Sequence, residues 1–154
     1  MKLYLVQHAK AASKEADPQR SLTEEGRWDM QKVSDFIETL DLSVDYLWHS
    51  GKTRAQQTAE ILAEVVEVTK EMSAHDGLSP NDDITPLKDE LISKNQDTMI
   101  VGHLPFMSKL ASLLLTGSES SNTVAFKNGG IVCLDYSDDN QWQLQWMIVP
   151  DLLL

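Results

Sequence analysis

Short apolar runs and longer amphipathic stretches alternate along the first two thirds of the chain. The runs Lys2–Val6, Val44–Trp48 and Thr98–Val101 have the length and composition of buried strands. Between them, apolar side chains recur at the i, i+3, i+4, i+7 spacing of amphipathic helices. Two such faces are present: Val33, Phe36, Ile37 and Leu40, then Ala55, Thr58, Ala59, Leu62 and Val66. Alternating strands and helices favour a mostly parallel sheet that helices cover on both faces.

Capping residues mark the ends of the predicted helices. Thr23 is typical of a helix N-cap, and two glutamates follow it in the first turn, where the helix dipole favours negative charge. A third helix is predicted over Pro86 to Lys94. Pro105 suits the first position of a fourth helix, whose apolar residues are Phe106, Leu110, Leu113 and Leu114. The segment Val65–Val68 leads into a stretch whose secondary structure stays ambiguous.

The end of the chain has a different pattern. Ile131–Tyr136 and Trp142–Val149 flank the polar segment Ser137–Asn140, which predicts an antiparallel hairpin. Alternating residues of the second strand are expected to cover one sheet face: Trp142, Leu144, Trp146 and Ile148. Residues 1–154 are therefore predicted to form a single three-layer α/β domain, with a mostly parallel sheet, helices on both faces and an antiparallel C-terminal hairpin.

Charge narrows the range of partners. The chain of 154 residues has 13 Lys+Arg against 24 Asp+Glu, which gives a formal net charge of −11. A surface of that sign repels polyanions, so we expect neither nucleic acid nor an anionic membrane as a partner. The net charge does not exclude binding of a small anion in a local cleft. The only cysteine, Cys133, lies in an apolar run and is expected in the core, without a disulfide.

No targeting or membrane segment is evident in the sequence. The N-terminal apolar run has four residues, Leu3–Val6, whereas a signal peptide needs ~7–15. No apolar stretch approaches the ~20 residues of a membrane span. The expected compartment is therefore the cytoplasm.

Two histidines follow predicted strands in the same way. The first strand, Lys2–Val6, is followed by Gln7-His8, and Thr98–Val101 is followed by Gly102-His103. A third strand ends at His49-Ser50, four residues before Arg54. Because ligands bind outside the carboxyl ends of the strands in open α/β sheets, we expect these groups to face one crevice. Two imidazoles, a guanidinium and helix N-termini suit a tetrahedral anion, above all phosphate.

The other histidines have simpler interpretations. His49 adjoins a strand end and His75 lies in a polar loop, and neither has the spacing of a metal ligand. We therefore predict no metal and no cofactor. The alternative for His8 and His103 themselves is that backbone carbonyls satisfy both rings; their matching positions, together with Arg54, favour the anion site.

Three segments together resemble a known family: Gln7–Ala9, Ser50–Ala59 and Val101–His103. They are similar to the motifs of the histidine phosphatase superfamily. In that family a strand ends in Arg-His-Gly or Arg-His-Ala, a later segment has the form Ser-x-x-x-Arg-Ala-x-x-Thr-Ala, and a second histidine follows glycine. The short chain, Leu22–Gly26 and Gly102–Pro105 are similar to the small SixA-type phosphohistidine phosphatases. The resemblance extends from residue 1 to about Leu115.

The resemblance implies a metal-independent phosphatase that acts through a phosphohistidine intermediate. His8 would be the nucleophile, and Arg54 and His103 would bind the phosphoryl oxygens. Gln7 stands at a phosphate-binding position where the family has arginine, and Lys10, Arg20 or Lys52 are the nearby candidates for the missing charge. The implied partner is a protein carrying phosphohistidine, or else a small phosphorylated substrate.

Two alternatives stay open. Because glutamine brings no charge and no bidentate fork, the chain could be a phosphate-binding or phosphoprotein-binding module with little turnover. A small-molecule phosphomonoesterase would need a carboxylic acid to protonate the leaving alkoxide. Asp76, Asp82 and Asp83 are the candidates, and none of them matches that role by position in the sequence.

Overall fold

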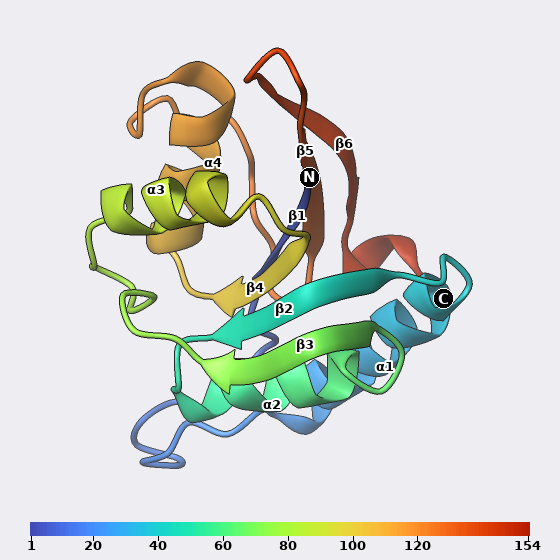
Figure 1. Cartoon of the computed structure of the whole chain (residues 1–154). Helices are drawn as coiled ribbons and strands as arrows, with labels where there is room; N and C mark the ends of the chain where they lie inside the picture. The colour runs from blue at the N-terminus through green and yellow to red at the C-terminus, as the bar shows by residue number, and fades with distance from the viewer.

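A six-stranded mixed sheet forms the centre of the computed structural model, which describes residues 1–154 (Figure 1). Its order is β3-β2-β4-β1-β5-β6. The strands are β1 (Lys2–Gln7), β2 (Ser43–His49), β3 (Glu67–Ala74), β4 (Thr98–Gly102), β5 (Ile131–Tyr136) and β6 (Trp142–Ile148). Neighbours from β3 to β1 are parallel, whereas β5 is antiparallel to β1 and β6 is antiparallel to β5. This is the predicted single α/β domain with a C-terminal hairpin.

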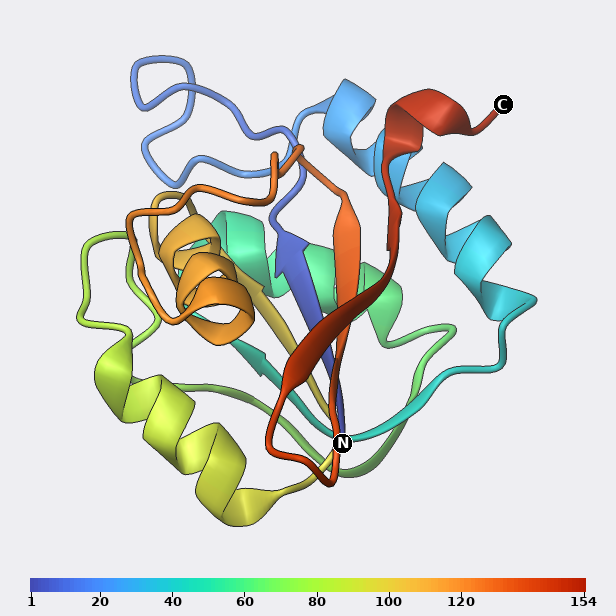
Figure 2. The same cartoon turned by 90° about the horizontal axis from the view of Figure 1, so that it is seen from above.

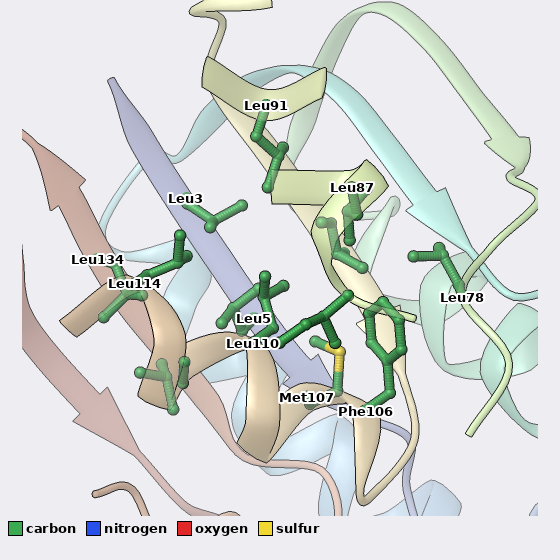
Figure 3. Close-up of a cluster of buried hydrophobic side chains, with 14 of the residues drawn as sticks. Leu3, Leu5, Leu78, Leu87, Leu91, Phe106, Met107, Leu110, Leu114 and Leu134 are labelled. Atoms are coloured by element: carbon green, nitrogen blue, oxygen red, sulfur yellow. The ribbon is translucent and has the colours of Figure 1, made fainter. Parts of the chain in front are cut away.

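Four helices cover the two faces of the sheet (Figures 1 and 2). They are α1 (Glu24–Glu38), α2 (Thr53–Leu62), α3 (Thr85–Lys94) and α4 (Phe106–Thr116), and a 3₁₀ turn, η1 (Pro150–Leu152), follows β6. The helices α1 and α2 pack on one face, around Val6, Leu47 and Val101. On the other face α3 and α4 pack around Leu5 and Ile100 (Figure 3). No helix has both the length and the apolar character of a membrane span.

The predicted start of α1 is confirmed, but its predicted apolar face is partly wrong. Thr23 is the N-cap, and its side chain accepts a hydrogen bond from the backbone N–H of Gly26. Val33 and Ile37 are fully buried, whereas Phe36 and Leu40 are 41% and 42% exposed. The helix ends at Glu38, so Leu40 lies in the turn beyond it, and Phe36 is not among its buried residues.

The strand β3 occupies part of the stretch that stayed ambiguous. It pairs only with β2, at the edge of the sheet, and most of its side chains are exposed. An edge strand with little buried surface needs no apolar run or strict alternation. Its segment, Glu67–Ala74, therefore lacks the signal that identified the other strands. Near α4, Pro105 is the N-cap rather than the predicted first helical residue.

The prediction that alternating residues of β6 cover one face of the sheet is wrong. Trp142 packs with the α3 and α4 side, whereas Trp146 and Ile148 pack with the α1 and α2 side. A bulge causes the change: Cys133 pairs with Trp146 and the next residue, Leu134, pairs with Leu144. One extra residue in β6 reverses the direction of every side chain that follows it.

Candidate active site

The register of the sheet brings the predicted site residues together at the carboxyl ends of β1, β2 and β4, which form one edge of the sheet. Gln7 is level with Gly102 in the β1–β4 pair, and the next residue, His8, donates its backbone N–H to the Gly102 carbonyl at 3.0 Å. On the other side of β4, His49 is level with Val101. The chain leaves all three strands at this edge. The rings of His8 and His103 consequently lie 5.0 Å apart between centroids, tilted by 53°.

The position of the proton on His8 follows from its backbone contact. Nδ1 lies 2.7 Å from the carbonyl oxygen of Ala9, and a carbonyl only accepts, so Nδ1 is the protonated donor. Burial lowers the pKa of His8, the contact with Ala9 opposes that change, and the charges of Arg54 and Arg20 lower it further. His8 is therefore neutral at pH 7, and its Nε2 has a free lone pair.

His103 is buried and held by one hydroxyl. Its Nε2 lies 2.6 Å from Oγ of Ser50, the residue directly after β2, and its Nδ1 is buried without a partner. Burial, followed by the charges of His8, Arg54, Lys52 and Arg20, lowers the pKa of His103 to about 3. The neutral ring presents one N–H donor, and an anion bound beside it would favour the protonated form of His103.

The helix α2 holds Arg54 and the end of β1 together. Arg54 is the second residue of the helix. Its backbone carbonyl accepts from the Thr58 hydroxyl at 2.8 Å, and the same hydroxyl oxygen accepts from the backbone N–H of Ala9 at 3.1 Å. Ala55 and Ala59 are fully buried, and their small side chains let the helix approach the sheet closely. The sequence pattern Arg-Ala-x-x-Thr-Ala is thus a packing motif as well as a source of charge.

Arg54 faces cations rather than acids. Its Nε is buried without a partner, and no ion pair involves its side chain. Burial lowers the pKa of the guanidinium and the neighbouring Arg20 adds to that effect, although an arginine stays charged at any physiological pH. An unpaired, partly buried guanidinium beside two imidazoles has the charge and the donors that suit an anion.

A loop that the sequence reasoning missed closes the site at β1. The Asn128 side chain donates to the carbonyl of His8 at 3.0 Å, and the backbone N–H of Gly129 donates to the carbonyl of Gln7 at 2.9 Å. Gly129 has φ +77°, a conformation that favours glycine. The signal that could have located this loop is the Asn-Gly pair at 128–129, which is typical of a turn.

The side chain of Gln7 lies at this edge without a partner for its oxygen. Oε1 is buried and accepts no hydrogen bond. The amide could donate to an anion, but it brings no charge.

The nearby cations differ in what they can do. Lys10 is paired with Glu25 at 2.6 Å, which directs its charge away from the site. Arg20 and Lys52 have no acidic partner, and both lower the pKa of His103 through their charge. Arg20 is held in place, because its Nε donates to the carbonyl of Ala12 at 3.0 Å. Of the three candidates to replace the missing arginine, Arg20 and Lys52 thus act on the site.

No carboxylate contributes to the pKa shifts of the candidate site residues at this edge. The charged groups that shift the pKa values of His8, Arg54 and His103 are all basic. The three candidate acids line a separate depression beside His75: they are Asp76, Asp82 and Asp83. Asp82 accepts from the backbone N–H of Ser79, and Asp83 from that of Thr85, so both stabilise their own loop.

The two other histidines have local partners. His75 contacts Glu90 through Nε2 at 3.0 Å and stacks on Trp48 with ring centroids 4.2 Å apart. Nδ1 of His49 accepts from the backbone N–H of Gly51 at 3.1 Å. Nowhere does the structure gather three or more His, Cys, Asp or Glu side chains that could hold a metal ion.

The first half of the chain matches the model of a known protein family. The family model of the histidine phosphatase superfamily (branch 1) matches residues 3–79, half of the 154 residues. The matched part includes His8 and Arg54, and His103 lies beyond it. No curated protein matches the chain in sequence.

Solved structures of the same fold cover almost the whole chain. The protein histidine phosphatase SixA in complex with tungstate has a TM-score of 0.86 at 18% identity, and 99% of each chain is covered. SixA from Agrobacterium tumefaciens has a TM-score of 0.76 at 24% identity, with 96% of this chain and 97% of that chain covered. A phosphoserine phosphatase from Entamoeba histolytica, solved with phosphoserine, has a TM-score of 0.72 at 17% identity, with 99% of each chain covered. At these identities the likeness is one of fold.

Proposed function

Because the chain belongs to the histidine phosphatase superfamily, we propose that it is a metal-independent phosphatase that acts on phosphohistidine in a protein. The observation that supports this most strongly is the pair of neutral imidazoles at the sheet edge, 5.0 Å apart, beside an arginine with no acidic partner. A relative of the same fold, the protein histidine phosphatase SixA, binds tungstate, which is a tetrahedral oxyanion like phosphate.

His8 is the nucleophile in this proposal. Its Nδ1–H is engaged by the Ala9 carbonyl, so Nε2 attacks phosphorus while the bond from phosphorus to the substrate nitrogen breaks. The substrate imidazole leaves with the electron pair of that bond and takes up a proton from solvent. Water then attacks the phosphorus bound to His8, inorganic phosphate departs, and Nε2 regains its lone pair.

Arg54 and His103 bind the phosphoryl oxygens in both steps. Charge is spread over these oxygens in the transition state, and fixed donors in a partly buried site stabilise it without the reorganisation that solvent would need. Ser50 orients His103 through the contact at 2.6 Å. Gln7 contributes a neutral amide donor, and Arg20 supplies the charge that the arginine of relatives would bring.

The absence of a nearby carboxylate favours phosphohistidine over a phosphate ester. An alkoxide leaving group needs a proton from a positioned acid, whereas imidazole is a far better leaving group. The candidate acids Asp76, Asp82 and Asp83 line a different depression from the imidazoles. This distribution argues against the small-molecule phosphomonoesterase.

The second candidate function is a binding module, and Gln7 is the observation that favours it. Without the second guanidinium, the site would bind a phosphoryl group and turn it over slowly. By comparison with the loss of one oxyanion donor, the missing contact costs about 10²–10³ in rate.

Hydrolysis assays test the proposed function. Purified protein is expected to hydrolyse phosphoramidate and a phosphohistidine peptide faster than p-nitrophenyl phosphate, between about pH 5 and about pH 8. His8→Ala should abolish all three activities. His75→Asn is the matched control, because His75 lies outside the site, and it should keep them.

Vanadate binding separates the two candidates. Calorimetric binding of vanadate together with hydrolysis supports the phosphatase, whereas binding without hydrolysis of any of the three substrates selects the binding module. If the protein neither binds vanadate nor hydrolyses these substrates, both proposals are wrong.

A further inference from the structure

A basic depression lies next to the proposed catalytic residues. It has a volume of about 380 Å³, and four of the side chains that line it are cationic: Lys14, Arg20, Lys52 and Arg54. No acidic and no hydrophobic side chain lines it. In a chain with a formal net charge of −11, a depression with four cations and no acid is a local reversal of the overall charge. Figure 1 shows the two segments that form it, the loop between β1 and α1 and the first turn of α2.

The depression shares Arg54 with the candidate catalytic residues. Arg54 lines it and also acts on both imidazoles, because its charge lowers the pKa of His8 and of His103. Arg20 acts on the same two histidines. A phosphoryl group at the imidazoles engages Arg54, and the remaining cations, above all Lys14 and Lys52, stay available for a second anion.

The fold keeps these charges unpaired. None of the four cations takes part in an ion pair. Asp17 lies in the same loop as Arg20, but its carboxylate accepts from the backbone N–H groups of Gln19 and Ser21. The loop is also fixed, since Ala12 donates its backbone N–H to the Ser21 carbonyl at 2.8 Å. Like charges held together repel each other, and an anionic ligand relieves that repulsion.

We propose that this depression binds acidic side chains that flank the phosphorylated residue of a protein substrate. The inference rests on the proposed function and adds a sequence preference to it. A charged peptide segment fits better than a small molecule, because pockets for small molecules are mostly apolar with few polar groups, and no hydrophobic side chain lines this one.

Two matched peptides test the inference through binding, independently of turnover. Both contain a non-hydrolysable phosphonate analogue of phosphohistidine; one has three flanking Asp or Glu residues, and the other has Asn or Gln instead. The acidic peptide is expected to bind about tenfold more tightly at low salt, and about 0.5 M salt should remove most of the difference.

The variant Lys14→Gln/Lys52→Gln is expected to reduce that ratio to about two or below. Lys70→Gln is the matched control: Lys70 is exposed on β3 and does not line the depression, so the ratio should stay unchanged. Phosphoramidate hydrolysis is measured beside each binding experiment. Phosphoramidate is a small molecule without flanking residues, so its hydrolysis reports on the proposed function alone.

Equal affinity of wild-type protein for the two peptides would overturn the inference, whether or not phosphoramidate is hydrolysed. A preference that survives in Lys14→Gln/Lys52→Gln would overturn it as well, because other residues would then recognise the acids. If a small phosphorylated carboxylate competes with vanadate while the two peptides bind equally, the depression serves a small molecule. A preference that is lost in the double variant, without phosphoramidate hydrolysis, would support the inference and reject the catalytic proposal.

Discussion

At the scale of single residues, the site depends on imidazoles that are kept neutral in a cationic environment. Burial lowers the pKa of His8, and the Ala9 carbonyl determines which of its nitrogens is protonated. In the proposed mechanism a protonated His8 would have no lone pair for phosphorus, so the nearby Arg54 would both attract the substrate and keep the nucleophile unprotonated. Gln7 is the residue at which this arrangement is weakest, because its side chain adds no charge.

A change at Gln7 tests how much the missing charge costs. We expect Gln7→Arg to raise kcat/KM for phosphoramidate by about 10², because a second guanidinium would stabilise the phosphoryl oxygens. In the background of Arg20→Gln, the same change should have a larger effect, since Arg20 would no longer compensate. The measurement is a double-mutant cycle on kcat/KM. Gln31→Arg, on the exposed side of α1, is the control and should leave the rate unchanged; equal activity of wild type and Gln7→Arg would contradict the prediction.

At the scale of elements, α2 connects the charged edge to the body of the fold. Its apolar face packs on the sheet through Ala55 and Ala59, and Thr58 joins the helix to the segment after β1. The position of Arg54 therefore depends on the packing of α2 against the sheet. The loop before α1 is attached to the same helix, because the side chain of Gln57 accepts from the backbone N–H of Leu22 at 2.8 Å.

Thr58→Val tests this connection. The side chain keeps its shape but loses its hydroxyl, so the backbone N–H of Ala9 is left buried without an acceptor. The free energy of unfolding should fall by about 1–3 kcal/mol, measured by urea denaturation. Hydrolysis should fall as well, because Ala9 orients His8. Thr69→Val is the control on exposed β3, with an expected change within about 0.5 kcal/mol; an equal loss in both variants would show that the Thr58 contact has no special role.

At the scale of the whole molecule, histidines couple stability to pH. Burial lowers the pKa of His8, His49 and His103 from the ordinary value of 6.5, for His103 to about 3. Well above pH 6.5 neither the folded nor the unfolded chain binds these protons. Below it, the unfolded chain binds more of them than the folded chain does, so acid favours unfolding.

The free energy of unfolding is therefore expected to decrease as the pH falls from about 6.5 to about 4, through protonation of histidines in the unfolded chain. Urea denaturation at a series of pH values measures this slope, and His103→Gln should reduce it. Asp17, whose pKa is lowered by backbone N–H groups, adds its own loss only near and below its ordinary value of 3.8. A stability that does not change between pH 7 and pH 4 would refute the assignment of neutral buried histidines.

From the amino-acid sequence alone, the main elements and a candidate anion site could be predicted. Buried strands such as Thr98–Val101 and the face of α2 have strong periodic signals, because each buries apolar side chains at fixed intervals. His8, Arg54 and His103 could be proposed as site residues because each follows such an element at its carboxyl end or begins the next one. The edge strand β3 and the Asn128 loop were not, since they are held by backbone pairing and have no apolar pattern.

Features that depend on pairing between distant segments could be seen only in the folded structure. The register of β1 with β4 brings His8 to His103, and no local pattern reports a register. A bulge opposite Cys133 turned Trp146 to the other face of the sheet, against a regular alternation in the sequence. The same holds for charge: the sum of −11 is a property of the composition, whereas the gathering of Arg20 and Lys52 around Arg54 arises only when the loop after β1 folds against α2.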